Sequence, residues 1–442
     1  MQVRIRKPVL FVLIPVFALG FFIGALLFFY RGGYEPPPQV QISFDEIVRA
    51  PASPGSFVDR PSRQSREGVL LVDAAHRNSF QPAEVVSLLN RIGPRGYDIK
   101  YLSNFSSGDA STRASQLEEG LRGADSFLVI LPSDSYSSQE AGLVEKFVGK
   151  GGEVLLIGDP TRRHDINSLA GRFGLDFQPD YLYNVHENDL NFQNIYVRDF
   201  QPDQLTQGLG EIVLYTAGSV KSTGPGLAFT DNTNTRSSIT DQIEQFQPLV
   251  RGNRNNVLAL YDLTFMIPPQ DSILDNGQLI SNLADFLTTG ARDFDLSDFP
   301  NYLDGEVDIL VEQPSLFSLG VDLKNDLSGA GVGATLRGVE DIARDTIILG
   351  LYADSPRAAR YLAESGIQLG EDLSTPFASN IALEDTALIL LDRNQDRDAL
   401  VILGDSTDSL EDAVKQLTSG DFRSGLVDDF VGVYKVGVYK TE

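Results

Sequence analysis

The chain has 442 residues, with 36 Lys and Arg against 61 Asp and Glu, which gives a formal net charge of -25 at pH 7. A negative field of this size repels nucleic acid and anionic lipid headgroups, so we expect no nucleic-acid partner. Cysteine is absent, which excludes disulfides, thiolate metal sites, a cysteine nucleophile and a lipidated N-terminal cysteine.

The first predicted element is an apolar run without charges, from Pro8 to Tyr30. At about 1.5 Å per residue the run is roughly 34 Å long, which is enough to cross a bilayer core. A cleaved signal peptide is the alternative, but the run is longer than a signal-peptide apolar region and lacks a small-x-small cleavage site. We therefore predict an uncleaved transmembrane helix over 8–30, preceded by a cytoplasmic tail over 1–7.

The charges that flank this run are uneven. Basic residues precede it at Arg4, Arg6 and Lys7, whereas Arg31 alone follows it closely. The positive-inside rule then places the N-terminus in the cytoplasm and the remaining domains outside it, so we expect a single-pass protein of the cell membrane. Within the run, Gly20 and Gly24 form a G-x-x-x-G pattern. Two interpretations stay open: a homodimer contact through these glycines, or chance glycines in an apolar helix.

Residues 31–66 are rich in proline. This composition stays extended and does not pack a core, so we predict a spacer between the membrane and the first domain.

From Gly68 onward, apolar strands alternate with amphipathic helices, which is typical of a parallel sheet covered on both faces. The predicted strands include GVLLVD, YDIKYLS, SFLVILP, EVLLIGDP and NVLALYD. Ser137 and Glu140 have capping-box spacing at the start of the helix SQEAGLVEKFVGK. The predicted fold class is α/β, with a flavodoxin-like parallel sheet over 67–290.

The last part of the chain has a different pattern. An acidic linker over 291–305 leads into a predicted α+β domain over 306–442. Within this domain, residues 345–437 follow the order strand, helix, strand, strand, helix, strand. This is the order of a ferredoxin-like sandwich, and we predict that fold here.

A tight turn made by Gly158, Asp159 and Pro160 follows the strand EVLLI. In several α/β enzymes a nucleophile lies on such a strand-to-helix turn, where backbone N–H groups stabilise an oxyanion. Here the position holds Asp159, whose carboxylate can itself accept those N–H groups. Gly158 supplies the conformational freedom of a sharp exit, and Pro160 fits the first turn of the next segment. We predict a degenerate elbow, without a nucleophile.

Three runs together resemble the class I glutamine amidotransferase-like domains of bacterial membrane-anchored proteins. They are GVLLVDAAHRNSF, ADSFLVILPSDSYSSQEAGLVEKFVGKGGEVLLIGDP and NVLALYDLTFMIPPQDSILDNGQLISNLADFL. The resemblance covers residues 66–290 and is to gliding-motility ABC transporter auxiliary proteins and to the amidotransferase-like domain of intraflagellar transport proteins. In true class I amidotransferases the aligned turn presents a nucleophilic cysteine that a histidine activates. Since this chain has no cysteine, the resemblance implies a pseudoenzyme that binds or scaffolds.

A metal site is the rival interpretation of the same region. Asp73, His76, Asp159 and His164 all follow predicted strands, at the sheet edge where open α/β sheets bind ligands. A mononuclear metal takes two imidazoles and a carboxylate, and its bound water is then a hydrolytic nucleophile. The plainer alternative is surface histidines, with His186 as the third, and turn-forming aspartates.

A second motif, DRNQDRD, has oxygen ligands at alternate positions, as calcium loops do. The residues are Asp392, Asn394, Asp396 and Asp398. However, position six is Arg397 instead of glycine, and position twelve is Leu403 instead of glutamate. We therefore predict a polar hairpin loop between two strands.

The sequence as a whole predicts an extracytoplasmic binding or scaffolding protein, anchored by one helix and placed in an envelope assembly, for example beside an ABC transporter. We expect protein partners, no cofactor and no bound metal. The alternative function is a metal-dependent hydrolase that uses Asp73, His76 and Asp159.

Overall fold

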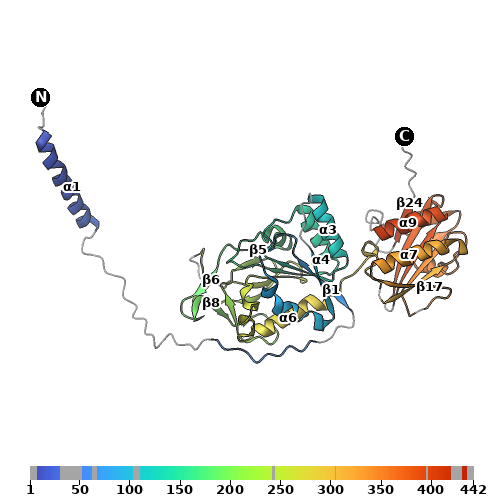
Figure 1. Cartoon of the computed structure of the whole chain (residues 1–442), viewed down its shortest axis with the longest axis horizontal. Helices are drawn as coiled ribbons and strands as arrows, with labels where there is room; N and C mark the ends of the chain where they lie inside the picture. Colours follow the sequence, from blue (N-terminus) through green and yellow to red (C-terminus); the bar gives the residue numbers. More distant parts are fainter. Residues whose placement is uncertain are drawn as a thin grey trace. The chain divides into compact units, whose positions relative to one another are not determined.

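The computed structural model divides the chain into two compact units, Met1–Pro51 and Ala52–Glu442 (Figure 1). The residues that it describes are 7–29, 52–61, 67–102, 110–240, 244–303, 305–341, 343–394, 397–419 and 431–435. Within these residues, the first unit holds one helix and the second holds two large sheets.

The predicted apolar helix is present as α1 (Lys7–Phe29). Its segment Phe11–Phe29 has a mean hydropathy of 2.7, is long and apolar enough to cross a membrane, and is not buried in the protein. Gly20 and Gly24 lie in this helix. The helix thus meets the transmembrane prediction in length and composition, while its orientation and the homodimer contact stay predictions. Tyr30 and the basic tail before Lys7 lie outside the described residues.

The first large sheet has eight strands in the order β2-β1-β3-β4-β15-β14-β12-β9. Its strands are β1 (Gly68–Asp73), β2 (Tyr97–Leu102), β3 (Ser126–Ile130), β4 (Glu153–Ile157), β9 (Asp199–Phe200), β12 (Gly226–Phe229), β14 (Leu249–Arg251) and β15 (Val257–Leu260). Strands β2, β1, β3, β4 and β15 are parallel, in the 2-1-3-4-5 order of flavodoxin-like sheets. The α/β class is therefore confirmed. The sheet is mixed, however, because β14, β12 and β9 extend it in antiparallel pairs.

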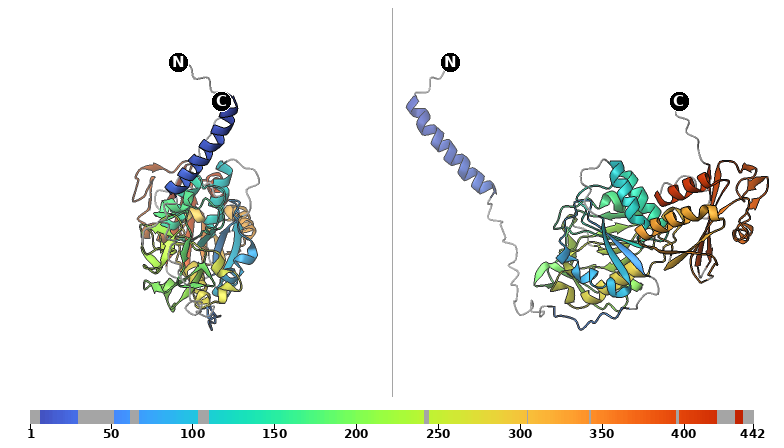
Figure 2. Two further views of the ribbon diagram at one scale, coloured as in Figure 1. Left: turned by 90° about the vertical axis from the view of Figure 1, so that its left-hand side faces the viewer. Right: turned by 45° about the vertical axis from the view of Figure 1, so that its right-hand side comes forward.

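Helices cover both faces of this sheet (Figures 1 and 2). Because side chains alternate along a strand, β1 buries Leu70 and Val72 in one core and Leu71 in the other. The first core includes residues of α2 (Val86–Leu89) and α6 (Asn276–Thr289). The second includes residues of α3 (Ala110–Arg122) and α4 (Ser138–Gly149). The buried parallel strands are almost wholly apolar for this reason.

Short elements surround this sheet and complete the loop-rich region before β14. They are α5 (Asn167–Ala170), β5 (Leu175–Phe177), β6 (Leu182–Asn184), β7 (Asn188–Asp189), β8 (Asn191–Val197), β10 (Ile212–Tyr215), β11 (Val220–Ser222) and β13 (Thr235–Ser237). Strands β8 and β10 pair antiparallel. Helices α2 and α5 are each four residues long, and 3-10 turns flank α2 and follow α5.

Residues 52–61 differ from the predicted spacer because they pack on the domain that holds the first large sheet, which we call the first domain. The Asp59 carboxylate accepts two hydrogen bonds of 3.0 Å from the Arg95 guanidinium and one of 2.8 Å from Ser281 Oγ. Arg95 is buried and also pairs with Asp285. A buried guanidinium needs such partners to offset its lost hydration, which explains why this proline-rich segment is held in place.

The predicted acidic linker, 291–305, is also packed. Arg292 is buried and donates hydrogen bonds to two carbonyls at the end of α3 and to the Asp298 carboxylate. Lys150 approaches the same Asp298 carboxylate at 3.0 Å. Asp298 thus pairs both with Arg292 of the same segment and with Lys150 at the C-terminal end of α4.

The second large sheet has the strand order β17-β16-β18-β23-β22-β24. Its elements are β16 (Glu306–Val311), α7 (Phe317–Gly329), β17 (Gly333–Arg337), β18 (Thr346–Leu351), α8 (Ala359–Glu364), β22 (Thr386–Asn394), β23 (Arg397–Gly404), α9 (Thr407–Ser419) and β24 (Val431–Lys435). A small sheet of β19 (Gln368–Leu369), β20 (Asp372–Ser374) and β21 (Ile381–Ala382) lies between α8 and β22 in sequence. Helices α7 and α9 contribute to one core and α8 to the other.

The ferredoxin-like prediction for 345–437 is wrong in its strand order. A ferredoxin-like sandwich would place β24 beside β18, the first strand of the predicted unit. Instead β16 occupies that edge of β18 as a parallel neighbour, and β24 pairs with β22. The strand before the predicted unit therefore belongs to the same sheet, and it displaces the last strand to the other side.

Candidate functional site

The candidate site lies where the strand order of the first sheet reverses, between β1 and β3. Open α/β sheets bind ligands outside the carboxyl ends of their strands at such a switch point. The loops after the two strands are joined here, because the N–H groups of Ser133 and Asp134 both donate to the His76 carbonyl, at 2.9 and 3.0 Å. Asn78 Nδ2 also donates to the Ile130 carbonyl at 2.8 Å.

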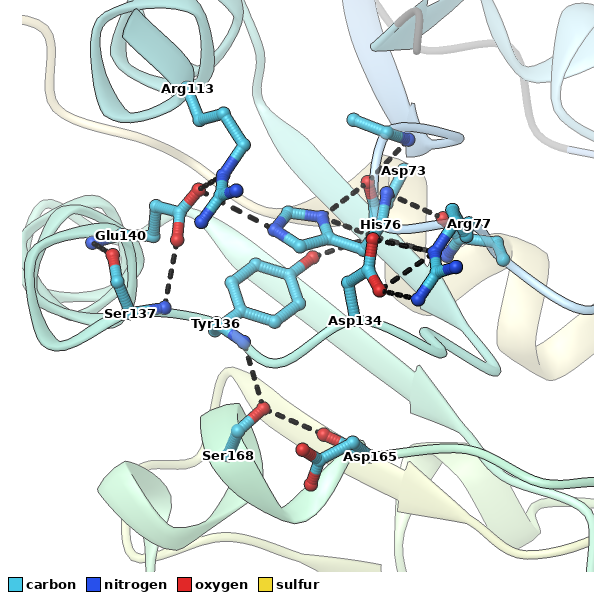
Figure 3. Close-up of polar contacts among 12 residues, drawn as sticks. Asp73, His76, Arg77, Arg113, Asp134, Tyr136, Ser137, Glu140, Asp165 and Ser168 are labelled. Atoms are coloured by element: carbon cyan, nitrogen blue, oxygen red, sulfur yellow. Dashed lines mark hydrogen bonds and ion pairs between the residues drawn. The ribbon is translucent and has the colours of Figure 1, made fainter. Parts of the chain in front are cut away.

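A buried polar cluster occupies this junction (Figure 3). His76 Nδ1 lies 3.0 Å from Asp73 Oδ1, and the Tyr136 hydroxyl donates to Asp73 Oδ2 at 2.7 Å. The rings of His76 and Tyr136 are stacked, with centroids 3.7 Å apart. All three side chains are buried. The structure thus confirms that Asp73 and His76 come together, and it adds Tyr136, whose role no sequence pattern indicated.

Glu140 closes the other side of the cluster. The predicted capping box is present, since Glu140 N donates to Ser137 Oγ and Ser137 N donates to Glu140 Oε2. The remaining oxygen, Oε1, faces His76 Nε2 at 3.7 Å and accepts a hydrogen bond of 3.4 Å from Arg113 Nε. One glutamate therefore both caps α4 and pairs with two cations, a role that the capping pattern alone does not indicate.

The charges of this cluster are strongly coupled. Burial by itself would lower the pKa of His76, but hydrogen bonds and attraction from Asp73 and Glu140 outweigh it and raise the pKa to about 9. Burial would raise the pKa of Glu140, but hydrogen bonds from His76 and Ser137 lower it to about 2. Burial also holds the pKa of Tyr136 well above its usual range. His76 is therefore an imidazolium at neutral pH, between two carboxylates.

A general base must be unprotonated at the working pH. A buried histidine with a pKa of about 9 does not meet this requirement, and its ring is nearly inaccessible, with 1% of its surface exposed. The accessible rim of the junction is instead the ion pair of Arg77 with Asp134, which joins the two loops at the surface. The arrangement thus locks the loops together and does not present a reactive group.

The turn after β4 is closed on itself. Asp159 is fully buried, and its Oδ1 accepts hydrogen bonds from Thr161 N at 2.9 Å and from Thr161 Oγ1. Its Oδ2 faces Leu263 N at 3.4 Å and Thr264 Oγ1 at 3.3 Å. The carboxylate thus accepts the N–H of its own turn, as the sequence predicted. Pro160 follows it at the rim of a cleft.

The reason for Gly158 differs from the prediction. Its φ is not positive, so no unusual backbone freedom is used. A Cβ at this position would instead stand 2.8 Å from the Tyr261 ring and 2.9 Å from the Phe177 ring. Close packing, and not a sharp turn, requires the glycine. A left-handed backbone does occur at the exit of β3, where Leu131 has a φ of 46°.

The proposed metal ligands do not form one site. The described residues contain no group of three or more His, Asp and Glu side chains that could hold a metal ion. Asp73 and His76 bond to each other, whereas Asp159 lies near Asp262, whose pKa burial and the Asp159 charge hold well above the usual range. The third histidine of the chain, His186, is exposed.

An open cleft of about 500 Å³ lies beyond the carboxyl ends of β4 and β15. Its lining includes Arg163, His164, Tyr181 and Tyr261. His164 Nδ1 has no hydrogen-bond partner among the described residues, and burial lowers the pKa of this histidine below its usual value. His164 Nδ1 is itself buried, whereas Arg163 is exposed and is a polar group that the cleft offers to a visiting molecule.

The predicted hairpin at DRNQDRD is confirmed. Strands β22 and β23 pair antiparallel up to Asn394 and Arg397, so Asp392 and Asp398 belong to the ladder. A ladder keeps these residues extended and prevents them from wrapping around a cation. Asp396 and the side chain of Asn394 lie outside the described residues.

No protein-family model matches the chain, and no curated protein matches its sequence. Solved structures similar to it include the mmIFT52 N-terminal domain, with 14% identity, 51% of this chain and 99% of that chain covered, and a TM-score of 0.40. A ThuA-like protein from Parabacteroides merdae has 10% identity, covers 51% of this chain and 91% of its own, and has a TM-score of 0.32. The structure of CpGH84D has 13% identity, covers 30% of this chain and 20% of its own, and has a TM-score of 0.21. The comparisons therefore assign no activity to this chain.

Proposed function

We propose that the protein is a single-pass, membrane-anchored binding or scaffolding protein of an envelope assembly, with an amidotransferase-like domain that does no chemistry. Its domains lie outside the cytoplasm and bind protein partners, as in an auxiliary component of an ABC transporter. The observation that carries the proposal is the Asp159 turn. A carboxylate that accepts the Thr161 N–H from within takes the donor that an oxyanion would need.

The junction between β1 and β3 supports the same function. His76 is cationic and buried between Asp73 and Glu140, so it cannot accept a proton from a nucleophile at neutral pH. Hydrogen bonds and ion pairs hold the two loops rigid instead. Rigid loops at a sheet edge are suited to recognition, because little conformational entropy is lost when a partner binds.

The open cleft is the place where we expect a partner to bind. Arg163 is exposed at its wall, and His164 Nδ1 has no bond to any described residue. This nitrogen is itself buried, so we expect the exposed Arg163 guanidinium to make the first polar contact with the partner. The proposed receptor thus combines a cleft on the domain of the first large sheet with a separate membrane anchor.

Site-specific photo-crosslinking in native membranes tests this proposal. The full-length chain carries the photo-reactive residue in place of Arg163, and a matched variant carries it in place of Val339, which is 78% exposed outside the first sheet. We expect one envelope protein to crosslink at position 163 and not at 339. Addition of unlabelled full-length chain should reduce this crosslink, because it competes for the same partner.

The purified protein is assayed in parallel on amides, esters and phosphoesters. We expect no turnover by the wild type. Turnover that Asp159→Ala abolishes while the fold survives would overturn the proposal and would favour a hydrolase. Equal crosslinking from positions 163 and 339 would show that the cleft is not the binding site of the partner.

A further inference from the structure

Three exposed apolar side chains, which we call the apolar tip, lie in the segment from the end of β6 to the start of β8. Leu190 is 80% exposed, Val185 is 62% exposed and Phe192 is 45% exposed, whereas both ends of β6 and the last three residues of β8 are buried. Leu190 forms the turn between β7 and β8 with a φ of 63°. Three exposed apolar side chains within eight residues are the kind of surface that an interaction partner or a membrane covers.

One residue of this tip, Phe192, belongs to a small group of aromatic rings. Tyr183 lies with its ring centroid 6.1 Å from that of Phe192, in a T-shaped contact, and 6.1 Å from that of Tyr181. Phe192 of the tip is therefore in contact with Tyr183, which in turn contacts Tyr181. Aromatic residues with one apolar end and one polar end are enriched where a protein meets the interface of a membrane.

The tether from the membrane helix enters the domain at this same place. Ala52 N donates a 2.9 Å hydrogen bond to Asp189 Oδ1, and Asp189 directly precedes Leu190. Backbone bonds continue the attachment, since Leu274 N donates to Ser53 O and Gly55 N donates to Ser272 O. Ala52, the first described residue after the helix, is thus bonded beside the apolar tip.

The length of chain between helix and domain limits how far this point can move. Helix α1 ends at Phe29, so about 22 residues lead to Ala52, and their fully extended length is at most about 75 Å. Such a tether keeps the tip at a high effective concentration near the bilayer, so that even a weak affinity for lipid is sufficient.

We propose that the tip of Val185, Leu190 and Phe192 inserts into the interface of the same bilayer that holds α1, and so orients the first domain on the membrane. The contact is apolar and does not depend on anionic lipid, because the chain carries a net charge of -25. The nearby Glu187 is paired with Arg198, which reduces the charge that approaches the headgroups. This inference rests on the proposed membrane anchor and adds an orientation to it.

The absence of tryptophan from the chain allows a direct test. Leu190→Trp places a unique fluorophore on the tip, and Val339→Trp places one at an equally exposed position, 78% against 80%. Each full-length variant is reconstituted into phosphatidylcholine vesicles, with and without bromine on the acyl chains. We expect brominated lipid to quench most of the Leu190→Trp emission, which is also blue-shifted, and to leave Val339→Trp unquenched.

Two outcomes would overturn the proposal. Unquenched emission of the Leu190→Trp variant would exclude contact with lipid, and a blue shift that instead rises with protein density in the vesicles would identify a second copy as the occupant. Alkaline extraction of the same vesicles separates this failure from a failure of the anchor. A Leu190→Trp protein that resists extraction while its emission stays unquenched refutes the orientation alone.

Discussion

His76 Nε2 and Glu140 Oε1 face each other 3.7 Å apart, across the junction between the loop after β1 and the first turn of α4. Asp73 holds the opposite nitrogen of the same ring at 3.0 Å. The imidazolium thus links two elements that the strand order brings together at the switch point. Its energetic role follows from the pKa values of the partners, and the resulting predictions concern stability.

We expect the protein to lose stability as the pH rises from about 6.5 to 9. The pKa of His76 is raised from 6.5 to about 9 in the folded state, so its contribution is complete below pH 6.5 and is lost as the pH passes 9. A shift of this size corresponds to at most about 3 kcal/mol in the free energy of unfolding. Urea unfolding of residues 52–442 at several pH values measures it. His76→Gln should show a flatter profile, and the exposed-histidine variant His186→Gln should behave as wild type.

A second loss of stability is expected in acid. The pKa of Glu140 is lowered from 4.5 to about 2, so its contribution is present above pH 4.5 and is lost as the pH falls toward 2. Glu140→Gln should remove this dependence and should also lower the pKa of His76, because one of the two carboxylates that favour the imidazolium is gone. An NMR titration of the His76 ring checks the second effect. An unchanged His76 pKa in Glu140→Gln would contradict the ion pair.

We expect Asp159 to act on stability and not on a reaction rate. Asp159→Ala removes the acceptor of the Thr161 N–H and should lower the free energy of unfolding by about 0.5 to 2 kcal/mol, which is the usual effect of losing a cap. Asp159→Asn keeps one acceptor oxygen and should cost less. Thermal and urea unfolding of both variants measure the difference. Equal stability of Asp159→Ala and wild type would show that the closed turn is not maintained in solution.

Asp59 should prove to be part of the folded domain. Its removal in Asp59→Ala leaves the buried Arg95 with Asp285 as the remaining carboxylate partner. We expect a loss of about 2 to 3 kcal/mol, below the roughly 3 to 5 kcal/mol of a buried ion that loses its whole partner. Asp98→Ala, at an exposed strand position, is the matched control. A fragment that begins at residue 66 should be destabilised in the same way as Asp59→Ala relative to 52–442.

Calcium should not bind at the hairpin of β22 and β23. The ladder holds Asp392 and Asp398 in extended strands, and the sequence lacks a bidentate acid at position twelve. Millimolar calcium should therefore change the melting temperature by less than about 1 °C, since a ligand stabilises only near or above its Kd. A rise of several degrees that Asp392→Ala abolishes would reveal a site.

The local patterns of the sequence predicted much of the first domain. Apolar runs such as SFLVILP and EVLLIGDP are long enough and apolar enough to be buried strands, and they became β3 and β4. The capping box at Ser137 and Glu140 could also be predicted from the sequence, because both partners lie within one helical turn. The acceptor role of Asp159 toward its own turn was predictable for the same reason. Each of these features depends on residues that are neighbours in the chain.

Tertiary structure alone decided the features that join distant segments. The pairing of Asp59 with Arg95, the contact of Tyr136 with Asp73, and the packing of Tyr261 against Gly158 each need the fold to bring the partners together. The same holds for the position of β24, which depended on β16 occupying an edge that the predicted unit left open. Local propensity carries no information on such competition between strands, because the outcome is set by which edge is already paired.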